Sequence, residues 1–320
     1  MSGPNGGRIV RLITCIGVDH DLALLPHFVD HYRALGIAPR DMIAILNTPD
    51  PDSPQLREAR DYCAGTGLQY KEWIAPYTSG TMWEKRREVQ NSACDAHDWV
   101  VSADVDEFHL YPEPLPDFLD RCERLGVNVV QGVFVDRLQR AGKLTPVEPG
   151  GSVSEQFPLS AAAMGTVGAI GRHHSRHSTV KVMALREGIM PARGGHDPLP
   201  DRRLRWLYGA SLGQFTGIDR AQYRFDVPTR VDHYHWTDRL RPSLEQRIAT
   251  PGASAAGREY GTRQLDYLDR NDGIAMKDIA IDPQPFPKNG WERRLSSMRR
   301  KGAAMTLAYR LRTLLLRRTG

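Results

Sequence analysis

The amino-acid sequence predicts an α/β fold, built as an open, mostly parallel sheet flanked by helices, with a helical extension at the C-terminus. Three observations indicate this class. Strand-like apolar runs alternate with segments of helical apolar spacing through the first 135 residues, a rhythm typical of parallel sheets. Turns containing glycine and proline separate many of these segments. One apolar run, 99–103, leads directly into carboxylates, and open α/β sheets bind ligands beyond the carboxyl ends of their strands.

The first elements follow from local pattern. Segment 9–16 is an apolar strand, and segment 24–35 repeats apolar residues at helical spacing and ends at Gly36. The same criteria predict further strands at 42–46, 68–74, 99–103 and 127–135, and helices at 56–64, 82–96 and 117–125.

The rhythm then stops. Residues 137–178 are rich in glycine, alanine and serine, and the apolar segments 180–185 and 227–231 are candidates for late strands. The simplest division is a main domain of 1–240 followed by a helical extension of 241–320.

Composition is that of an ordinary globular protein, with 40% hydrophobic and 25% charged residues in a chain of 320. Its four cysteines show no CxxC spacing, so we expect reduced, buried thiols. The N-terminus lacks the apolar core of a signal peptide, and no apolar run approaches the ~18 residues that a membrane span needs. These features predict a cytoplasmic protein.

The basic charge is concentrated in the tail. Residues 291–320 contain nine Lys and Arg against one acidic residue, a net charge of +8, whereas the rest of the chain carries 34 basic and 37 acidic residues. Composition therefore gives no reason to expect nucleic-acid binding by the body of the protein. Because apolar residues recur at helical spacing in this tail, it predicts either an interfacial helix on the anionic inner face of a membrane or an ordinary packed helix.

The acidic cluster after residue 103 is the strongest functional signal. Asp104, Asp106 and Glu107 follow a run apolar enough to be buried, and buried carboxylates are costly unless positive charge meets them. Mg²⁺ and Mn²⁺ take oxygen ligands and keep open positions for water or phosphate. The cluster predicts such a metal site, and the alternative is an acidic surface turn.

The neighbouring motifs resemble those of bacterial family-2-like glycosyltransferases and of glycosyltransferase family 92. The segment 24–36 is similar to their first helix, with an apolar pair followed by Phe, His-Tyr and Leu-Gly. The other matching positions, in chain order, are Lys85-Arg86, Asn91, Asp98-Trp99-Val100, Asp104-Val105-Asp106-Glu107-Phe108, Lys181, His196 and His233-Tyr234.

This resemblance implies a GT-A-type fold over 1–240, a divalent metal (Mn²⁺ or Mg²⁺) and a nucleotide-sugar donor, with a UDP-sugar expected. The activity it implies is an inverting, hexosyltransferase-type sugar transfer to a hydroxyl of a saccharide or lipid-linked acceptor, as in polysaccharide biosynthesis. The chain departs from the broader family pattern at two places. Asn47-Thr48 stands where many members carry an Asp pair, and Asp19-His20-Asp21 stands where Asn-Glu is usual.

The resemblance also implies roles for single residues. Asp106 is the expected metal ligand, and Asp104 is expected to contact the metal and the sugar or ribose hydroxyls. His233 and His196 are the two candidates for a third protein ligand, with His233 preferred. The expected donor-binding residues are Asp104, Arg86, Asn91, Lys181 and Asn47.

An inverting transferase needs a general base for the acceptor hydroxyl. Asp197, on the glycine-rich turn after Gly195, is the preferred candidate, with Glu155 and Asp232 as alternatives. The basic segment 172–177 is interpreted either as a cationic wall for a diphosphate or as a surface loop.

Two other classes of protein stay open at the level of sequence. A metal-dependent phosphoesterase or nucleotidyltransferase could use the same carboxylates and histidines. A catalytically silent carbohydrate- or lipid-binding protein on the same scaffold is the second, and the departures near Asp19 and Asn47 keep it open.

Overall fold

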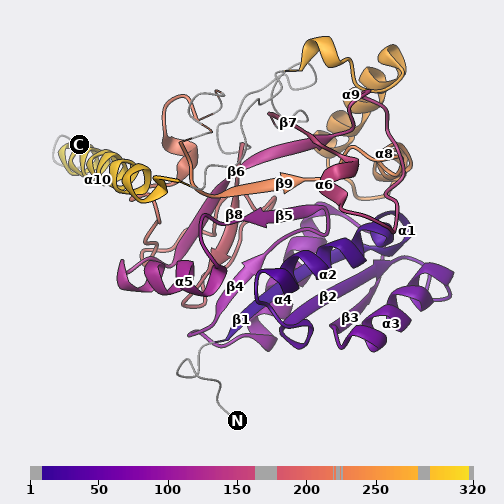
Figure 1. Ribbon diagram of the computed structural model, residues 1–320, viewed down its shortest axis with the longest axis horizontal. Helices are drawn as coiled ribbons and strands as arrows, with labels where there is room; N and C mark the ends of the chain where they lie inside the picture. The colour runs from indigo at the N-terminus through magenta and orange to yellow at the C-terminus, as the bar shows by residue number, and fades with distance from the viewer. Residues whose placement is uncertain are drawn as a thin grey trace.

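A computed structural model describes residues 9–162, 179–218, 220, 224, 226–279 and 289–316, without the side chains of 278 and 313–316. In these residues a single nine-stranded sheet has the order β3-β2-β1-β4-β8-β6-β9-β5, with β7 paired to β6 (Figure 1). The strands are β1 (Val10–Gly17), β2 (Met42–Thr48), β3 (Gln69–Ile74), β4 (Trp99–Ser102), β5 (Glu107–Leu110), β6 (Val129–Leu138), β7 (Leu159–Ala162), β8 (Val180–Leu185) and β9 (Arg230–His233).

The N-terminal half of the sheet is parallel, as predicted. Strands β3, β2, β1 and β4 pair in parallel, and every residue of β2 is buried, as both faces are covered. Local signals delimit the helices: the Ser53 side chain accepts from the Leu56 amide at the start of α3, and Gly67 ends that helix with φ 75°. The helices here are α1 (Val18–Asp21), α2 (Leu25–Ala34), α3 (Pro54–Thr66) and α4 (Ser79–Ala93).

The second half of the sheet is mixed. Strand β8 is antiparallel to both β4 and β6, and β5 is antiparallel to β9. Because the chain turns at 103–106, β5 does not pair with β4 but lies at the far edge of the sheet. The turn carrying the acidic cluster therefore joins two separate parts of the sheet. The helices beside this half are α5 (Leu115–Arg124) and the short α6 (Val153–Gln156).

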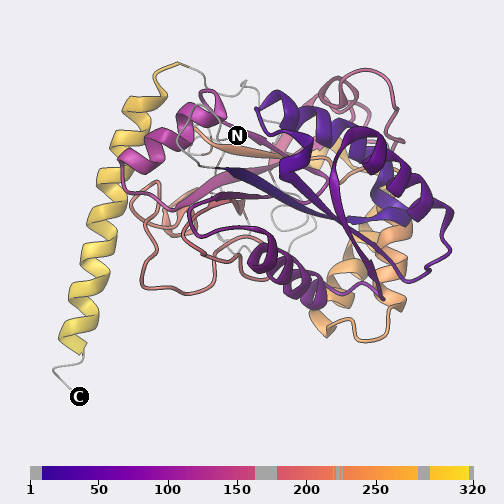
Figure 2. The ribbon, with the colours of Figure 1, turned by 90° about the horizontal axis from the view of Figure 1, so that it is seen from below.

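The C-terminal helices lie at two ends of the molecule. Helices α8 (Leu240–Ala249) and α9 (Ala255–Asn271) pack together near α1, whereas α10 (Trp291–Leu316) runs along the opposite side (Figures 1 and 2). The α/β class, with flanking helices and a helical extension, is thus confirmed. Among the described residues, no helix combines the length and apolar character that crossing a bilayer requires. Short 3₁₀ turns occur at Leu22–Leu24, Pro39–Asp41, Leu212–Gln214 and Met276–Asp278.

Candidate functional site

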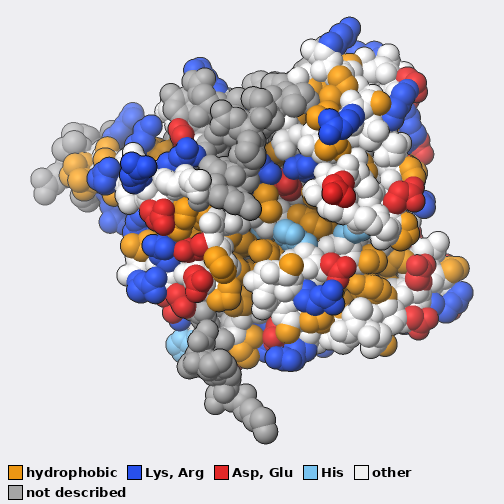
Figure 3. All heavy atoms as spheres, viewed as in Figure 1, with side chains coloured by type: hydrophobic (Ala, Val, Ile, Leu, Met, Phe, Trp, Pro, Cys, Tyr) orange, Lys and Arg blue, Asp and Glu red, His pale blue; other side chains and the backbone are white. Residues whose placement is uncertain are grey.

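A cleft of about 270 Å³ opens at the carboxyl ends of the parallel strands. Its floor comes from the ends of β1, β2 and β4, and α8 and α9 form its opposite wall. Figure 3 shows histidine side chains at the centre of this face, between the strands and the C-terminal helices. The domain boundary expected at residue 240 lies between the sheet and helices α8 and α9. Both sides of that boundary therefore line the same cleft.

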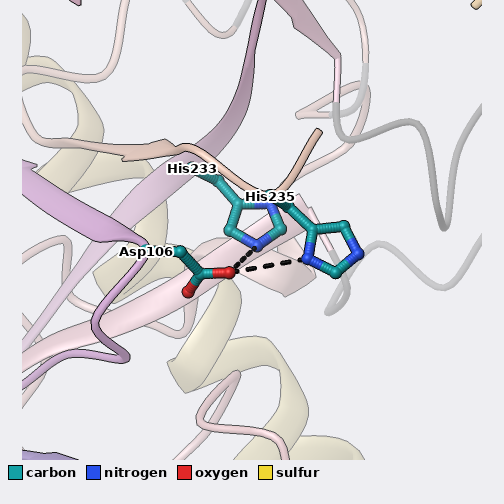
Figure 4. Close-up of side chains that lie close together, drawn as sticks. All are labelled: Asp106, His233 and His235. Atoms are coloured by element: carbon teal, nitrogen blue, oxygen red, sulfur yellow. Dashed lines mark ion pairs between the residues drawn. The ribbon is translucent and has the colours of Figure 1, made fainter. Parts of the chain in front are cut away.

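Three donor atoms converge on the floor of this cleft. Oδ2 of Asp106 lies 3.2 Å from Nε2 of His233 and 3.5 Å from Nδ1 of His235. The two imidazole rings are stacked, with centroids 4.9 Å apart and 10° between their planes. Figure 4 shows both rings directed at the same carboxylate oxygen. One carboxylate and two imidazoles thus have ligand atoms within 4.8 Å of one another.

A second carboxylate fixes the orientation of this cluster. The buried Asp136, on β6, lies with Oδ1 2.6 Å from Nδ1 of His233. A ring N–H donated to Asp136 leaves Nε2 as the nitrogen facing Asp106, an arrangement common around metal-binding histidines. Although burial opposes a positive charge, Asp106 and Asp136 raise the pKa of His233 to about 10. Burial likewise disfavours the Asp106 carboxylate, but His233 and His235 hold its pKa well below the usual value.

A separate pair of carboxylates is already neutralised by cations. Asp104 accepts from Nη1 of Arg86 at 2.8 Å, and Nζ of Lys181 lies 2.5 Å from Glu107 and 3.6 Å from Asp104. Burial raises the pKa of Asp104, but Arg86 and Lys181 outweigh it and lower the pKa overall. Arg86 is itself buried and also donates to the carbonyl oxygens of Ile13 and Ala103. It therefore acts as a support for the acidic turn.

The donor set decides which residues fit a divalent cation. Asp104, Asp106 and Glu107 also lie close enough to share an ion, but two of these carboxylates already have cationic partners. In the group of Asp106, His233 and His235, by contrast, one carboxylate oxygen faces a ring nitrogen of each imidazole. Asp106, His233 and His235 are thus the better fit. Two imidazole nitrogens and one carboxylate favour Mn²⁺ over Mg²⁺, which prefers oxygen.

His196 lies beside this cluster without joining it. It lines the cleft, but its Nδ1 lies 2.8 Å from the Val180 carbonyl oxygen. Burial, reinforced by Lys181, lowers the pKa of His196 to about 4. Among the described residues it belongs to neither group of candidate ligands.

Polar groups from the end of β2 and from α1 also line the cleft. Asn47 is buried and donates to the carbonyl oxygens of Trp73 and Ala75 at 2.8 and 2.9 Å. Asp19 accepts from the Thr48 hydroxyl at 2.9 Å. The residues at both departures from the family pattern therefore line the same cleft as the acidic turn.

The proposed general base does not lie in the cleft. Oδ1 of Asp197 accepts from Gln131 at 3.1 Å and from Ser211 at 3.0 Å, and this side chain is not among the cleft-lining groups. Asp232 is paired with Arg137 and Arg230. Asn91 and Glu155 are exposed and lie outside the cleft. The basic segment 172–177 lies outside the described residues.

Asp21 is a cleft carboxylate that sequence reasoning did not assign. It is half-buried beside the metal-binding candidates and lines the cleft. Burial first, and then the charges of Asp106 and Asp104, raise its pKa to about 7. His235 was not among the preferred ligands, although its position two residues after His233 in an extended segment places both rings on one side.

A second cavity of about 510 Å³ adjoins the cleft and shares Asp104, Lys181 and Arg247 with it. The helix starts at Ser79 and Ser254 line it. Arg247 forms no ion pair within the described part of the chain. The cavity is therefore predominantly cationic, with Arg193 as a further lining residue.

Comparison with known proteins adds no family assignment. No family model matches the chain, and no curated protein matches its sequence. Solved structures with a similar chain arrangement include TarS 1-349 of S. aureus, at 10% identity and a TM-score of 0.33, covering 82% of this chain and 72% of that one. The same protein in complex with UDP-GlcNAc gives 9% identity and a TM-score of 0.33, with 91% and 80% covered. The choice between family 2 and family 92 stays a prediction.

Proposed function

We propose that this protein is a metal-dependent glycosyltransferase that moves a sugar from a nucleoside diphosphate sugar to a hydroxyl acceptor. The observation that carries this proposal is the convergence of Asp106, His233 and His235 at the carboxyl edge of the parallel strands. This is the edge at which open α/β sheets bind their ligands. A divalent cation held there would offset the charge of the leaving diphosphate.

The remaining residues divide into supports and ligand contacts. Arg86 positions Asp104, because its Nη1 and Nη2 both donate to groups of the protein. Lys181 lines the cleft while paired with Glu107, and Arg247 supplies positive charge toward a diphosphate. Asn47, Thr48 and Asp19 border the part of the cleft proposed for the nucleoside, for which UDP is the first candidate. The adjoining cationic cavity is proposed to receive the acceptor.

For the general base we propose Asp21 in place of Asp197. Asp21 lines the cleft, whereas Asp197 is held by Gln131 and Ser211. We expect Asp21→Asn to lower kcat by at least about 100-fold, the scale of general base catalysis, and to abolish the acidic limb of the pH–rate profile. Asp197→Asn should instead lower thermal stability with little change in kcat. The reverse pattern would restore the original assignment.

The function is tested by thermal-shift screening with nucleotide sugars, with and without Mn²⁺, followed by product analysis. A stabilising shift that needs both components, and release of nucleoside diphosphate when a saccharide acceptor is added, supports the transferase. Release of inorganic phosphate or pyrophosphate would identify a phosphoesterase or nucleotidyltransferase instead. Carbohydrate binding that needs neither Mn²⁺ nor a nucleotide sugar would identify a binding protein.

A further inference from the structure

Within the described residues, helix α10 contacts the body through one of its faces. Trp291 and Leu295 are buried, and Nη1 of Arg299 donates to the Leu207 carbonyl oxygen at 2.8 Å. Gly302 lies against the backbone of 208–210, where a Cβ atom would overlap the Tyr208 carbonyl oxygen. One turn later the Thr306 hydroxyl donates to the carbonyl oxygen of Gly209 at 2.9 Å.

Beyond Thr306 the described surface of the helix is exposed. Every described side chain from 307 to 312 is exposed, including large apolar ones: Leu307 is 59% exposed, Tyr309 73% and Leu311 53%. Figure 2 shows the C-terminal end of α10 extending beyond the rest of the molecule. Three large exposed apolar side chains within five residues are unusual on a surface that faces only water.

Two of these exposed apolar residues, Leu307 and Leu311, lie on the face opposite the docked one, whereas Tyr309 falls on the same side as Trp291. At 3.6 residues per turn each residue advances by about 100°, which places 291, 295, 302 and 306 on one side of the helix. Positions 304, 307 and 311 then fall on the other side, and the sequence continues that spacing with leucines at 314 and 315. The single apolar stripe expected from the sequence is therefore two stripes. Leu295, Met298 and Met305 belong to the docked one, as their contacts with the core show.

Basic residues surround the outward stripe. On the same geometry, Arg310 and Arg312 flank it on its two sides, and both are exposed. Arg293, Arg300 and Lys301 are exposed on the preceding turns. The sequence contains no acidic residue after Glu292. Cations beside an apolar stripe suit a surface that offers both negative charge and hydrocarbon.

We propose that the outward face of α10 binds the surface of an anionic lipid bilayer. The stripe of Leu307 and Leu311 enters the boundary between headgroups and acyl chains, and the flanking arginines contact lipid phosphates. A second copy of this chain fits less well, because two such cationic faces would repel each other. The proposal rests on α10 alone and is independent of the transferase activity.

Vesicle flotation tests the proposal with the full-length protein. Vesicles of phosphatidylcholine, with and without phosphatidylglycerol, are used at low and high salt. We expect flotation only with phosphatidylglycerol, and less of it at high salt, because salt screens exposed charges. The double variant Leu307→Ser/Leu311→Ser should reduce partitioning by about tenfold or more, since each buried leucine contributes strongly to transfer from water. Arg310→Gln/Arg312→Gln should weaken binding to anionic vesicles at low salt.

Matched controls are available on the body. Leu125→Ser/Leu199→Ser removes two leucines that are 40% and 39% exposed, and Arg40→Gln/Arg202→Gln removes two exposed cations. Both controls should float like the wild type. Equal flotation on neutral vesicles, absence of flotation, or equal losses in the controls would overturn the proposal. So would a stable dimer in light scattering that the Leu307→Ser/Leu311→Ser variant alone converts to a monomer, because a second copy would then occupy this face.

Discussion

Asp106 is the residue on which the proposed metal site depends. It supplies the carboxylate of the cluster and faces both His233 and His235. We expect Asp106→Asn to keep the fold, because the amide has the same shape, and to abolish Mn²⁺-dependent binding of UDP in calorimetry. Asp136→Asn should weaken Mn²⁺ affinity by about 10-fold or more, the typical loss for a residue that orients a ligand. Unchanged Mn²⁺ binding in Asp106→Asn would contradict the assignment.

His196 provides a prediction about stability and pH. Its pKa of about 4 lies below the value of about 6.5 in an unfolded chain. Between these values the unfolded state binds more protons, so stability is complete above about pH 6.5 and is lost as the pH falls toward 4. The free energy of unfolding, measured by urea titration, should therefore fall between pH 6.5 and pH 4. In His196→Gln we expect this fall to be smaller by on the order of 2 to 3 kcal/mol. The exposed His97→Gln variant should follow the wild type, and parallel profiles for all three would refute the prediction.

Single residues of the cleft differ in how far the sequence could predict them. The resemblance to the glycosyltransferase motifs nominated Asp104, Asp106, Lys181 and His233, and the structure brings all four to one cleft. The orientation of a side chain depends on its long-range partners. Asp197 is held by Gln131, which is 66 residues away in the sequence, and local pattern contains no sign of that bond.

At the scale of elements, the docking of α10 depends on a close backbone approach. Replacing a glycine in a helix interior by alanine normally raises the free energy of unfolding by about 1 kcal/mol. We expect Gly302→Ala to destabilise instead, by roughly 1 to 3 kcal/mol as an overpacked contact, because its Cβ would overlap the Tyr208 carbonyl oxygen. Gly65→Ala in α3, where a Cβ would meet nothing within 4 Å, should be neutral or stabilising. Equal urea midpoints for the two variants would show that α10 is not tightly docked.

The strands of the parallel half were predictable and those of the mixed half were less so. In β1, β2 and β4 the buried run is continuous, and a continuous apolar run is a signal that local sequence carries. Strand β5 has only four residues and pairs with β9, more than one hundred residues later. From sequence alone, this segment is indistinguishable from a continuation of the acidic turn. Its position at the far edge of the sheet is determined by its pairing with β9.

At the scale of the whole molecule, the cleft is shared by segments far apart in the chain. The sheet contributes the acidic turn, and α8 and α9 contribute Arg247 and Tyr260. His20 and Gln246 form a direct hydrogen bond between α1 and α8. A ligand that fills the cleft therefore contacts both parts at once, and its binding energy should also stabilise the packing of the C-terminal helices.

Hydrogen exchange can detect this coupling. With UDP and Mn²⁺ at about 100 times their dissociation constant, binding should stabilise the protein by about 2.7 kcal/mol and slow amide exchange in α8 and α9 as well as at the carboxyl end of β4. Arg247→Gln should reduce this protection, because Arg247 faces the cleft without an ion-pair partner in the described chain. Arg241→Gln, on the same helix but paired with Asp269, should retain it. Protection confined to the sheet, or equal losses in both variants, would show that the helices cover the cleft without taking part in binding.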